Sequence, residues 1–265
     1  MGKSIGIVSL KGGVGKTSTV VSLGDSLADF GQKVLLVDAN YSSPNLGIHL
    51  SILDPEKTVK DVLLGVSNIS DAIYVFNNKL HVLPAHLFDN TKINPFSLKN
   101  KLKTIKGDYD VVLIDSSPKL DDDTLGAMLA SDELFAVTTP DYATLATTIK
   151  AIKEAKERGI PISGLILNKV HNEDFELSIQ NIEETAEVPV MAVIPYDMNI
   201  LRAQSQFIPS TLQSPNSRAS IEYKKLASTL IGQKYRPFSI RELFTAITPK
   251  RQDVNRELYY KRVFK

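Results

Sequence analysis

Residues 9–19 bring glycine, lysine and hydroxyl side chains together at a spacing suited to phosphate chemistry. Three glycines within four positions let the backbone adopt conformations barred to other residues, so that successive N–H groups can point at one anion. Lys16 can reach terminal phosphates, and the Thr17 hydroxyl is placed to ligate Mg²⁺. The segment therefore predicts a phosphate-binding loop. The residues expected to contact a nucleotide there are Lys11, Gly12, Gly13, Val14, Gly15, Lys16, Thr17 and Ser18.

Two aspartates stand where apolar runs of the sequence stop. Asp38 follows the run Lys33–Val37, and Asp115 closes the run Val111–Ile114. Such short runs are typical of parallel strands covered on both faces, and ligands of these sheets bind at the carboxyl ends of the strands. We therefore expect Thr17, Asp38 and Asp115 to form a Mg²⁺ site, with Asp115 bonded to Thr17 or to a metal-bound water. Ordinary turn or helix-capping aspartates are the alternative.

The phosphate loop lies between an expected strand at 4–9 and an expected helix at 17–30, and further strands and helices alternate along the chain. This alternation without an internal repeat predicts an α/β fold, a doubly wound and mostly parallel sheet with helices on both faces. The other expected strands are 33–37, 80–83, 109–115, 134–138, 162–167 and 190–194. The other expected helices are 58–64, 95–105, 121–129, 143–157 and 217–230.

The loop departs from the common Gly-x-x-x-x-Gly-Lys-Ser/Thr pattern, because Leu10 replaces the first glycine and Lys11 precedes the others. The segment Lys-Gly-Gly-Val-Gly-Lys-Thr resembles the deviant Walker A loop of the MinD/ParA family of ATPases. The resemblance covers about residues 4–232 and implies a P-loop NTPase fold, ATP as ligand and an ATP-bound homodimer. It also implies that Lys11 crosses the dimer interface to the partner's nucleotide and stabilises charge there during phosphoryl transfer.

The segment after Asp38 resembles the family's first switch region, which normally reads Asp-x-Asp and ends near Asn-Leu. Asp38 and Asn45-Leu46 match this form, whereas Asn40 replaces the second aspartate. In the family that aspartate helps to orient the attacking water, and an amide keeps an acceptor oxygen but is a poorer proton acceptor. The residues expected to act in hydrolysis are Lys11, Lys16, Asp38 and Asn40. We expect Asn40 to slow the reaction without abolishing it.

Residues 168–171, Asn-Lys-Val-His, begin like the Asn-Lys-x-Asp signature by which GTPases hold guanine. The fourth residue of that signature must be a carboxylate to accept both guanine N–H groups, and His171 cannot do so. Adenine is therefore favoured. The resemblance implies that Asn168 meets the adenine edge and that a loop passes the other side of the base, while a strand-end turn residue is the alternative for Asn168. The loop residues are Pro195, Tyr196 and Asp197.

Positive charge is concentrated at the C-terminus. The 265-residue chain has a formal net charge of +1, yet residues 233–265 contain nine Lys or Arg against three Asp or Glu. Nonspecific DNA binding needs several phosphate-facing cations, and residues 1–232 offer no evident excess, so DNA is the less favoured partner. The absence of cysteine excludes disulfides and Cys-bound metal clusters, and no apolar stretch approaches a membrane span. We therefore expect a cytoplasmic protein.

Residues 233–265 are expected to form a basic amphipathic tail behind an ATPase domain of residues 1–232. Ser239 and Glu242 make a capping box. Apolar side chains follow at helical spacing, namely Ile240, Leu243, Phe244 and Ile247. Further on, Tyr259, Tyr260, Val263 and Phe264 share one side of an expected helix, opposite Lys261, Arg262 and Lys265. Two interpretations stay open. The tail holds the protein reversibly on an anionic membrane, or Ile240, Leu243, Phe244 and Ile247 dock on the protein's own sheet.

The MinD branch of the family is the most similar, because Leu83-Pro84-Ala85, Thr139-Pro140 and Arg236-Pro237-Phe238 resemble it. The implied function is ATP binding, ATP-driven dimerisation and slow hydrolysis, coupled to the positioning of cell-division machinery through a regulatory or cargo protein. One alternative is a ParA-type ATPase that partitions chromosomes or other cargo. Another is a nucleotide-dependent recruitment switch that hardly hydrolyses ATP.

Overall fold

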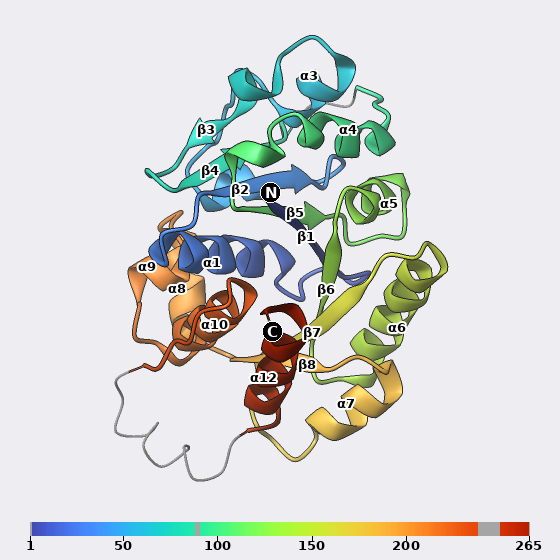
Figure 1. Cartoon of the computed structure of the whole chain (residues 1–265), viewed down its shortest axis with the longest axis vertical. Coiled ribbons are helices and arrows are strands. Elements are labelled where there is room, and N and C mark those ends of the chain that lie inside the picture. Colours follow the sequence, from blue (N-terminus) through green and yellow to red (C-terminus); the bar gives the residue numbers. More distant parts are fainter. Residues whose placement is uncertain (1, 88–90, 238–249, 265) are drawn as a thin grey trace.

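The chain is built around one eight-stranded sheet (Figure 1). The computed structural model describes residues 2–87, 91–237 and 250–264. In these residues the strand order is β3-β4-β2-β5-β1-β6-β7-β8, and every neighbouring pair is parallel except β3 and β4. The strands are β1 (Lys3–Val8), β2 (Val34–Ala39), β3 (Tyr74–Val75), β4 (Leu80–Leu83), β5 (Val111–Ser116), β6 (Glu133–Thr138), β7 (Ile162–Val170) and β8 (Val190–Pro195).

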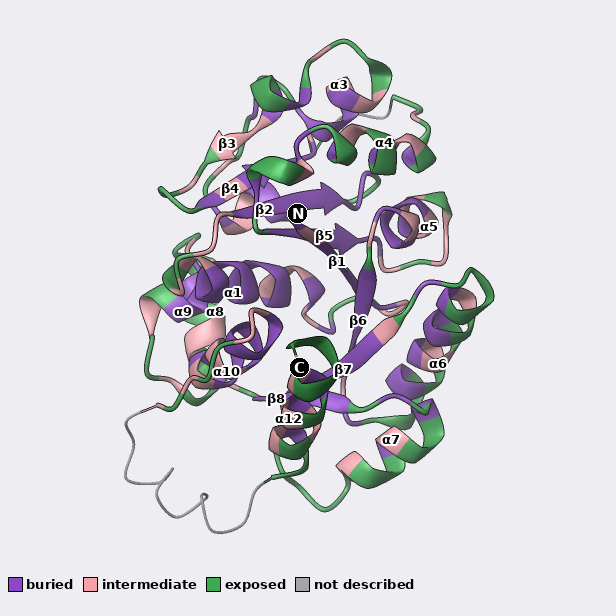
Figure 2. Ribbon diagram, in the orientation of Figure 1, coloured by how far each residue is buried: buried purple, intermediate pink, exposed green. Residues whose placement is uncertain are grey.

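Helices cover both faces of the sheet, because successive side chains of each buried strand point to opposite faces. Leu36 of β2 joins a core under α1 and α10, whereas Leu35 and Val37 join a second core under α3, α4 and α5. A third core lies under α6 and α7, and Figure 2 shows the strands buried while the helices expose their outer sides. The helices are α1 (Lys16–Asp29), α2 (Leu46–His49), α3 (Val59–Leu64), α4 (Leu98–Lys103), α5 (Asp122–Leu129), α6 (Tyr142–Glu157), α7 (Ile179–Ala186), α8 (Met198–Ser205), α9 (Ser210–Gln213), α10 (Arg218–Leu230) and α12 (Arg251–Phe264).

The predicted fold class is confirmed, and the principal difference lies at the end of β7. The apolar run predicts a strand that ends at Leu167, but β7 continues through the polar pair Asn168 and Lys169 to Val170. Pairing with β8 shifts register between Leu167 and Val170, and Val170 then lies opposite Pro195. The strand can include these polar residues because their side chains find partners outside the sheet.

The C-terminal helix α12 packs against β8 and α10. The Tyr259 ring lies against Phe135, with ring centroids 6.4 Å apart, and its hydroxyl donates a 3.0 Å hydrogen bond to Glu133. Arg256 is also buried and pairs with Glu222 at 3.0 Å. This half of the tail therefore packs on the domain. That packing does not test the docking expected for Ile240, Leu243, Phe244 and Ile247, and the domain boundary after residue 232 stays a prediction.

Two further findings bear on the tail. The predicted helix at 240–247 lies outside the described residues. Within residues 2–87, 91–237 and 250–264, no helix is long and apolar enough to cross a membrane. On α12 itself, Val263 and Phe264 are 41% and 43% exposed, so the apolar side predicted for this helix is only partly covered.

Candidate functional site

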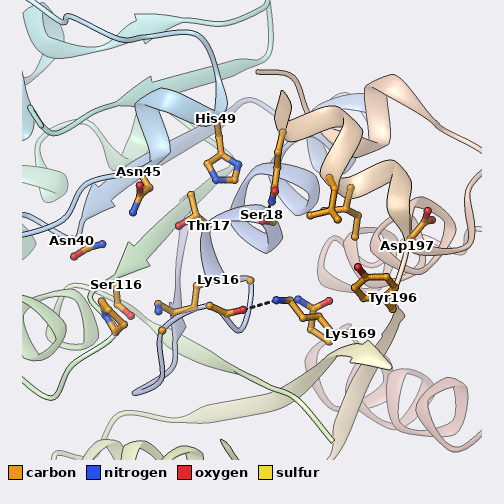
Figure 3. A pocket seen from close by; sticks show the side chains of 18 of the residues that line it. Lys16, Thr17, Ser18, Asn40, Asn45, His49, Ser116, Lys169, Tyr196 and Asp197 are labelled. Atoms are coloured by element: carbon orange, nitrogen blue, oxygen red, sulfur yellow. Dashed lines mark hydrogen bonds between the residues drawn. The ribbon is translucent and has the colours of Figure 1, made fainter. Parts of the chain in front are cut away.

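A cavity of about 350 Å³ opens at the carboxyl edge of the sheet, between the phosphate loop and α8 (Figure 3). Its walls come from segments far apart in the chain. They include the loop 12–18, the switch segment with Asn40 and Asn45, Ser116 after β5, and the 195–197 loop. The topology brings most of the residues predicted from sequence to one place, as expected for parallel strands whose carboxyl ends share an edge.

The phosphate loop has the backbone shape that its glycines predict. Gly13 and Gly15 have φ angles of 76° and 95°, in the left-handed region that favours glycine, and Gly15 precedes the first turn of α1. Lys16 is only 7% exposed. Burial lowers the pKa of Lys16, and the nearby Asp115 charge partly opposes this shift. A buried cation beside a helix N-terminus is suited to an anionic ligand.

The two strand-end acids lie side by side. Asp38 of β2 and Asp115 of β5 are partners in the parallel register, and both are fully or almost fully buried. Thr17 Oγ1 donates a 2.6 Å hydrogen bond to Asp115 Oδ2, as the sequence predicts. Burial raises the pKa of both carboxyls, and repulsion by Asp115 adds to the shift at Asp38. Such a pair is stabilised by a cation.

These residues fit a Mg²⁺ ion. Asp115 Oδ1 is buried and has no hydrogen-bond partner among the described residues, so one carboxylate oxygen is left for another ligand. No group of three or more His, Cys, Asp or Glu side chains in the described part of the chain could hold a metal by itself. Mg²⁺ does not need three such side chains, because it is usually held by one or two carboxylates together with water and substrate phosphates.

The segment after β2 wraps around Asp38. The Asp38 carboxylate accepts hydrogen bonds from the backbone N–H groups of Asn40, Asn45 and Leu46, at 3.1, 3.2 and 3.0 Å. The Asn40 side chain donates to the Ser43 carbonyl. Its Oδ1 is buried without a hydrogen-bond partner among the described residues, and Asn40 lines the cavity. An acceptor oxygen is therefore available beside the metal-site acids.

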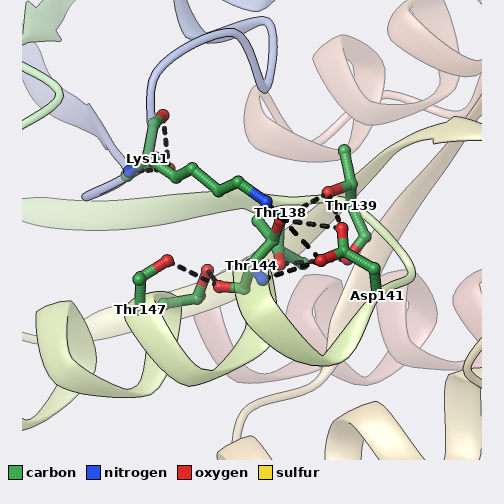
Figure 4. Close-up of polar contacts among 8 residues, drawn as sticks. Lys11, Thr138, Thr139, Asp141, Thr144 and Thr147 are labelled. Atoms are coloured by element: carbon green, nitrogen blue, oxygen red, sulfur yellow. Dashed lines mark hydrogen bonds and ion pairs between the residues drawn. The ribbon is translucent and has the colours of Figure 1, made fainter.

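Lys11 extends toward the start of α6 (Figure 4), and it is not among the residues that line the cavity. Its ammonium donates a 2.8 Å hydrogen bond to Thr144 Oγ1 and lies 3.6 Å from Asp141, at the start of α6. Burial alone would raise the pKa of Asp141, but hydrogen bonds from Thr139 and Thr144 and the Lys11 charge outweigh it and lower the pKa to about 2. The Lys11 side chain is 43% exposed, so a partner can reach it.

The side of the cavity predicted to hold adenine is formed by Asn168 and the 195–197 loop. Asn168 Nδ2 donates a 2.7 Å hydrogen bond to the Val14 carbonyl of the phosphate loop, and its Oδ1 is buried without a described partner. Tyr196 lines the cavity and stacks on His171, with ring centroids 4.7 Å apart. Asp197 accepts a hydrogen bond from the Asn199 N–H group at the start of α8. Pro195 also lines the cavity.

Sequence reasoning missed several residues that line this cavity, among them Lys169, Gln204 and His49. Lys169 Nζ donates a 2.7 Å hydrogen bond to the Gly13 carbonyl. Gln204 of α8 donates a 2.7 Å hydrogen bond to the Ser18 hydroxyl. His49 ends α2, and burial lowers its pKa. Only Lys169 had a local signal, since it belongs to the Asn-Lys pair discussed above.

A family model and several known proteins match this chain in sequence. A family described as AAA domain matches residues 2–163. An uncharacterized ATP-binding protein of Methanocaldococcus jannaschii is 35% identical over 237 residues, which cover 89% of this chain and 90% of the relative. The sporulation initiation inhibitor protein Soj of Bacillus subtilis is 31% identical over 247 residues, 86% of this chain and 97% of Soj.

A solved structure also matches this chain over most of its length. The septum site-determining protein MinD from Pyrococcus horikoshii, complexed with Mg-ADP, matches with a TM-score of 0.82 and 34% identity over 87% of this chain and 96% of that chain. The parallel sheet, the glycine-rich loop ahead of α1 and the strand-end acids define a P-loop nucleotide-binding protein. The chain belongs to the MinD/ParA family of P-loop ATPases, whose members are nucleotide-dependent switches. The resemblance seen in the loop Lys11–Thr17 is thus confirmed.

Proposed function

We propose that this protein binds ATP with Mg²⁺, dimerises on binding it and hydrolyses it slowly. Mg²⁺, held by Thr17, Asp38 and Asp115, would supply charge neutralisation at the phosphate oxygens. Lys16 and the loop N–H groups bind the phosphates. The free Asn40 Oδ1 accepts a hydrogen bond from the attacking water and orients it. The fit of the buried acid pair to a cation is the observation that supports this chemistry best.

Dimerisation is supported by the surface around Lys11. Because Lys11 points to α6 and not into its own pocket, its charge is available to a second subunit. Tyr142 at the start of α6 and Phe175 after β7 are each 78% exposed, and both follow strands that end at the site edge. Exposed apolar side chains beside a ligand site are typical of an association surface. A second copy bound there would draw Lys11 from Thr144 to the partner's nucleotide.

The cellular role that we propose is based on the likeness to MinD. We propose that the ATP-bound dimer positions cell-division machinery through a regulatory or cargo protein and associates reversibly with the inner face of the membrane. The apolar side chains of 240–247 and the basic tail support the membrane contact, and two tails in one dimer would bind more tightly than one. Partitioning of DNA or cargo is the second candidate, supported by the likeness to Soj. The Asn40 amide favours the third, a recruitment switch with very little hydrolysis.

Cosedimentation separates these roles. The full chain is mixed with anionic lipid vesicles or with duplex DNA, each in the presence of Mg-ATP or Mg-ADP. We expect ATP-dependent binding to vesicles and little binding to DNA. A Phe244→Glu variant should lose vesicle binding; this substitution is preferable to removing residues 233–265, because truncation would also remove the buried side chains of α12. ATP-dependent binding to DNA but not to vesicles would support the partitioning role.

A further inference from the structure

The end of β7 holds the phosphate loop by two carbonyl groups. Lys169 Nζ donates to the Gly13 carbonyl (Figure 3), and Asn168 Nδ2 donates to the Val14 carbonyl, both at 2.7 Å. The loop and the strand are separated by more than 150 positions in the chain. Neighbouring residues of one strand therefore take consecutive carbonyls of the loop.

The backbone at Lys169 is shaped for this contact. Lys169 has a φ of 58°, a left-handed conformation that is uncommon for residues other than glycine. It lies where the pairing of β7 with β8 shifts register, and pairing resumes at Val170, opposite Pro195. Such conformations persist where the surrounding structure enforces them, and they gather at functional sites. The kink allows Lys169 to leave the sheet and reach the loop.

The loop and Asn168 are also in very close contact. A Cβ atom added at Gly15 would lie 2.3 Å from Asn168 Nδ2, so a side chain at this position would displace the amide. At Gly12 and Gly13 an added Cβ would meet no described atom within 4 Å. The loop is thus in its closest contact with β7 at Gly15, whereas Gly12 and Gly13 have open space where a Cβ atom would lie.

Peptide planarity converts these two carbonyl contacts into the orientation of two N–H groups. In a trans peptide the C=O and the following N–H point in opposite directions. Holding the Gly13 carbonyl toward Lys169 turns the Val14 N–H the other way, and holding the Val14 carbonyl toward Asn168 does the same for the Gly15 N–H. Successive N–H groups turned to one side make an anion-binding concavity.

We propose that Lys169, assisted by Asn168, is a positioning residue that sets the phosphate loop in its anion-binding shape before any nucleotide arrives. This inference rests on the proposed function, because it assumes that the loop binds nucleotide phosphates. The loop is then already ordered when a nucleotide binds, so less binding free energy is lost in ordering it. The affinities for ATP and ADP should both increase for this reason.

The test compares Lys169→Met, which keeps the length of the side chain and loses its donor, with Lys169→Arg, which restores a donor. Lys150→Ala, an exposed lysine on α6, is the control. Backbone order parameters of Val14 and Gly15 are measured by NMR in the nucleotide-free protein, and dissociation constants are measured for Mg-ADP and Mg-ATP. We expect Lys169→Met to lower the order parameters at both positions and to weaken both nucleotides about 10-fold, as for a lost hydrogen bond to a charged group. The kcat at saturating ATP should stay within about twofold, because the lost interaction serves both ground state and transition state.

Other outcomes would overturn the proposal. Weaker nucleotide binding with unchanged order parameters in the nucleotide-free variant would mean that Lys169 contacts the nucleotide directly. Unchanged order parameters and unchanged affinity would mean that the loop keeps its shape unaided. If the unmodified protein bound no nucleotide, the proposed function would fail, while lower order parameters in Lys169→Met and their recovery in Lys169→Arg would still support the positioning role.

Discussion

Asn40 is the side chain on which the expected rate of hydrolysis depends. It lies beside Asp38, is 5% exposed, and presents a buried Oδ1 without a described hydrogen-bond partner. An amide oxygen can orient a water molecule, but it cannot take up a proton as a carboxylate can. We therefore propose that Asn40 orients the attacking water and is a weaker base than an aspartate at this position would be.

Replacing Asn40 by Asp should raise turnover. We expect Asn40→Asp to increase kcat about 10-fold or more if base assistance limits the reaction. ATP affinity should change little, since Asn40 does not hold phosphates. The measurement is phosphate release at saturating ATP, with dimer formation confirmed for both proteins. Equal or lower turnover in Asn40→Asp would show that this position does not limit the chemistry.

The acid pair links the site to pH-dependent stability. Burial raises the pKa of Asp38 and of Asp115 in the nucleotide-free protein. The unfolded chain releases these protons near pH 4, whereas the folded protein retains them to higher pH. Between those values the folded state binds more protons, so the free energy of unfolding falls as pH rises. The site is thus costly to the fold at neutral pH until a cation occupies it.

An Asp38→Asn variant removes one of these titrating groups. Its stability relative to the unmodified protein should increase from pH 5 to pH 8 in chelator, while its ATP hydrolysis is impaired. Urea unfolding at several pH values measures this trend, which is separate from any constant effect of altered hydrogen bonds to the loop. Asp122→Asn, a change at an exposed acid of α5, should show no such trend. A pH-independent difference for Asp38→Asn would contradict the account.

The elements of the sheet were predictable because their signals are local. Apolar runs marked β1, β2, β5 and β6, and the acids at the ends of β2 and β5 could be assigned to the site edge from the topology of parallel sheets. The extension of β7 was not predictable, since Asn168 and Lys169 are stabilised by loop residues more than 150 positions away. Gln204 was missed for the same reason, because its contact with Ser18 depends on how α8 packs.

The contacts of helix α12 also could not be predicted from local sequence signals. Its sequence predicts an apolar side and a basic side, but not that Tyr259 would be 3% exposed and bonded to the buried Glu133. The ammonium of Lys3 also lies 2.8 Å from Glu133, and Ser163 donates a 2.6 Å hydrogen bond to it. This cluster joins the last helix to the first strand and to the amino ends of β6 and β7.

Removing the Tyr259 hydroxyl should therefore weaken the whole fold. We expect Tyr259→Phe to lower the free energy of unfolding by about 1–2 kcal/mol, because a buried hydrogen bond to a charged group is lost. Tyr260→Phe is the control, since Tyr260 is less buried and shares the same helix turn. Chemical denaturation of the full chain measures both. Equal stability of the two variants would show that α12 is not held through Glu133.

Taken as a whole, the molecule has its candidate nucleotide site, Lys11 and the exposed Tyr142 and Phe175 at the carboxyl edge of the sheet. The opposite edge carries the buried Glu133 cluster and α12. In the proposed function, chemistry and association share the carboxyl edge, and a second subunit bound there would contact the site directly. Lys11 would then link nucleotide and dimer, since its present partners, Thr144 and Asp141, lie at the border of that surface.

Sedimentation velocity of the full chain and of Lys11→Ala, each with Mg-ATP or Mg-ADP, tests this link most directly. We predict that the unmodified protein is a dimer with ATP and a monomer with ADP. Lys11→Ala should remain a folded monomer with both nucleotides and should lose hydrolysis. A Lys11→Ala protein that still dimerises with ATP, and hydrolyses it at the unmodified rate, would contradict the cross-subunit role of Lys11.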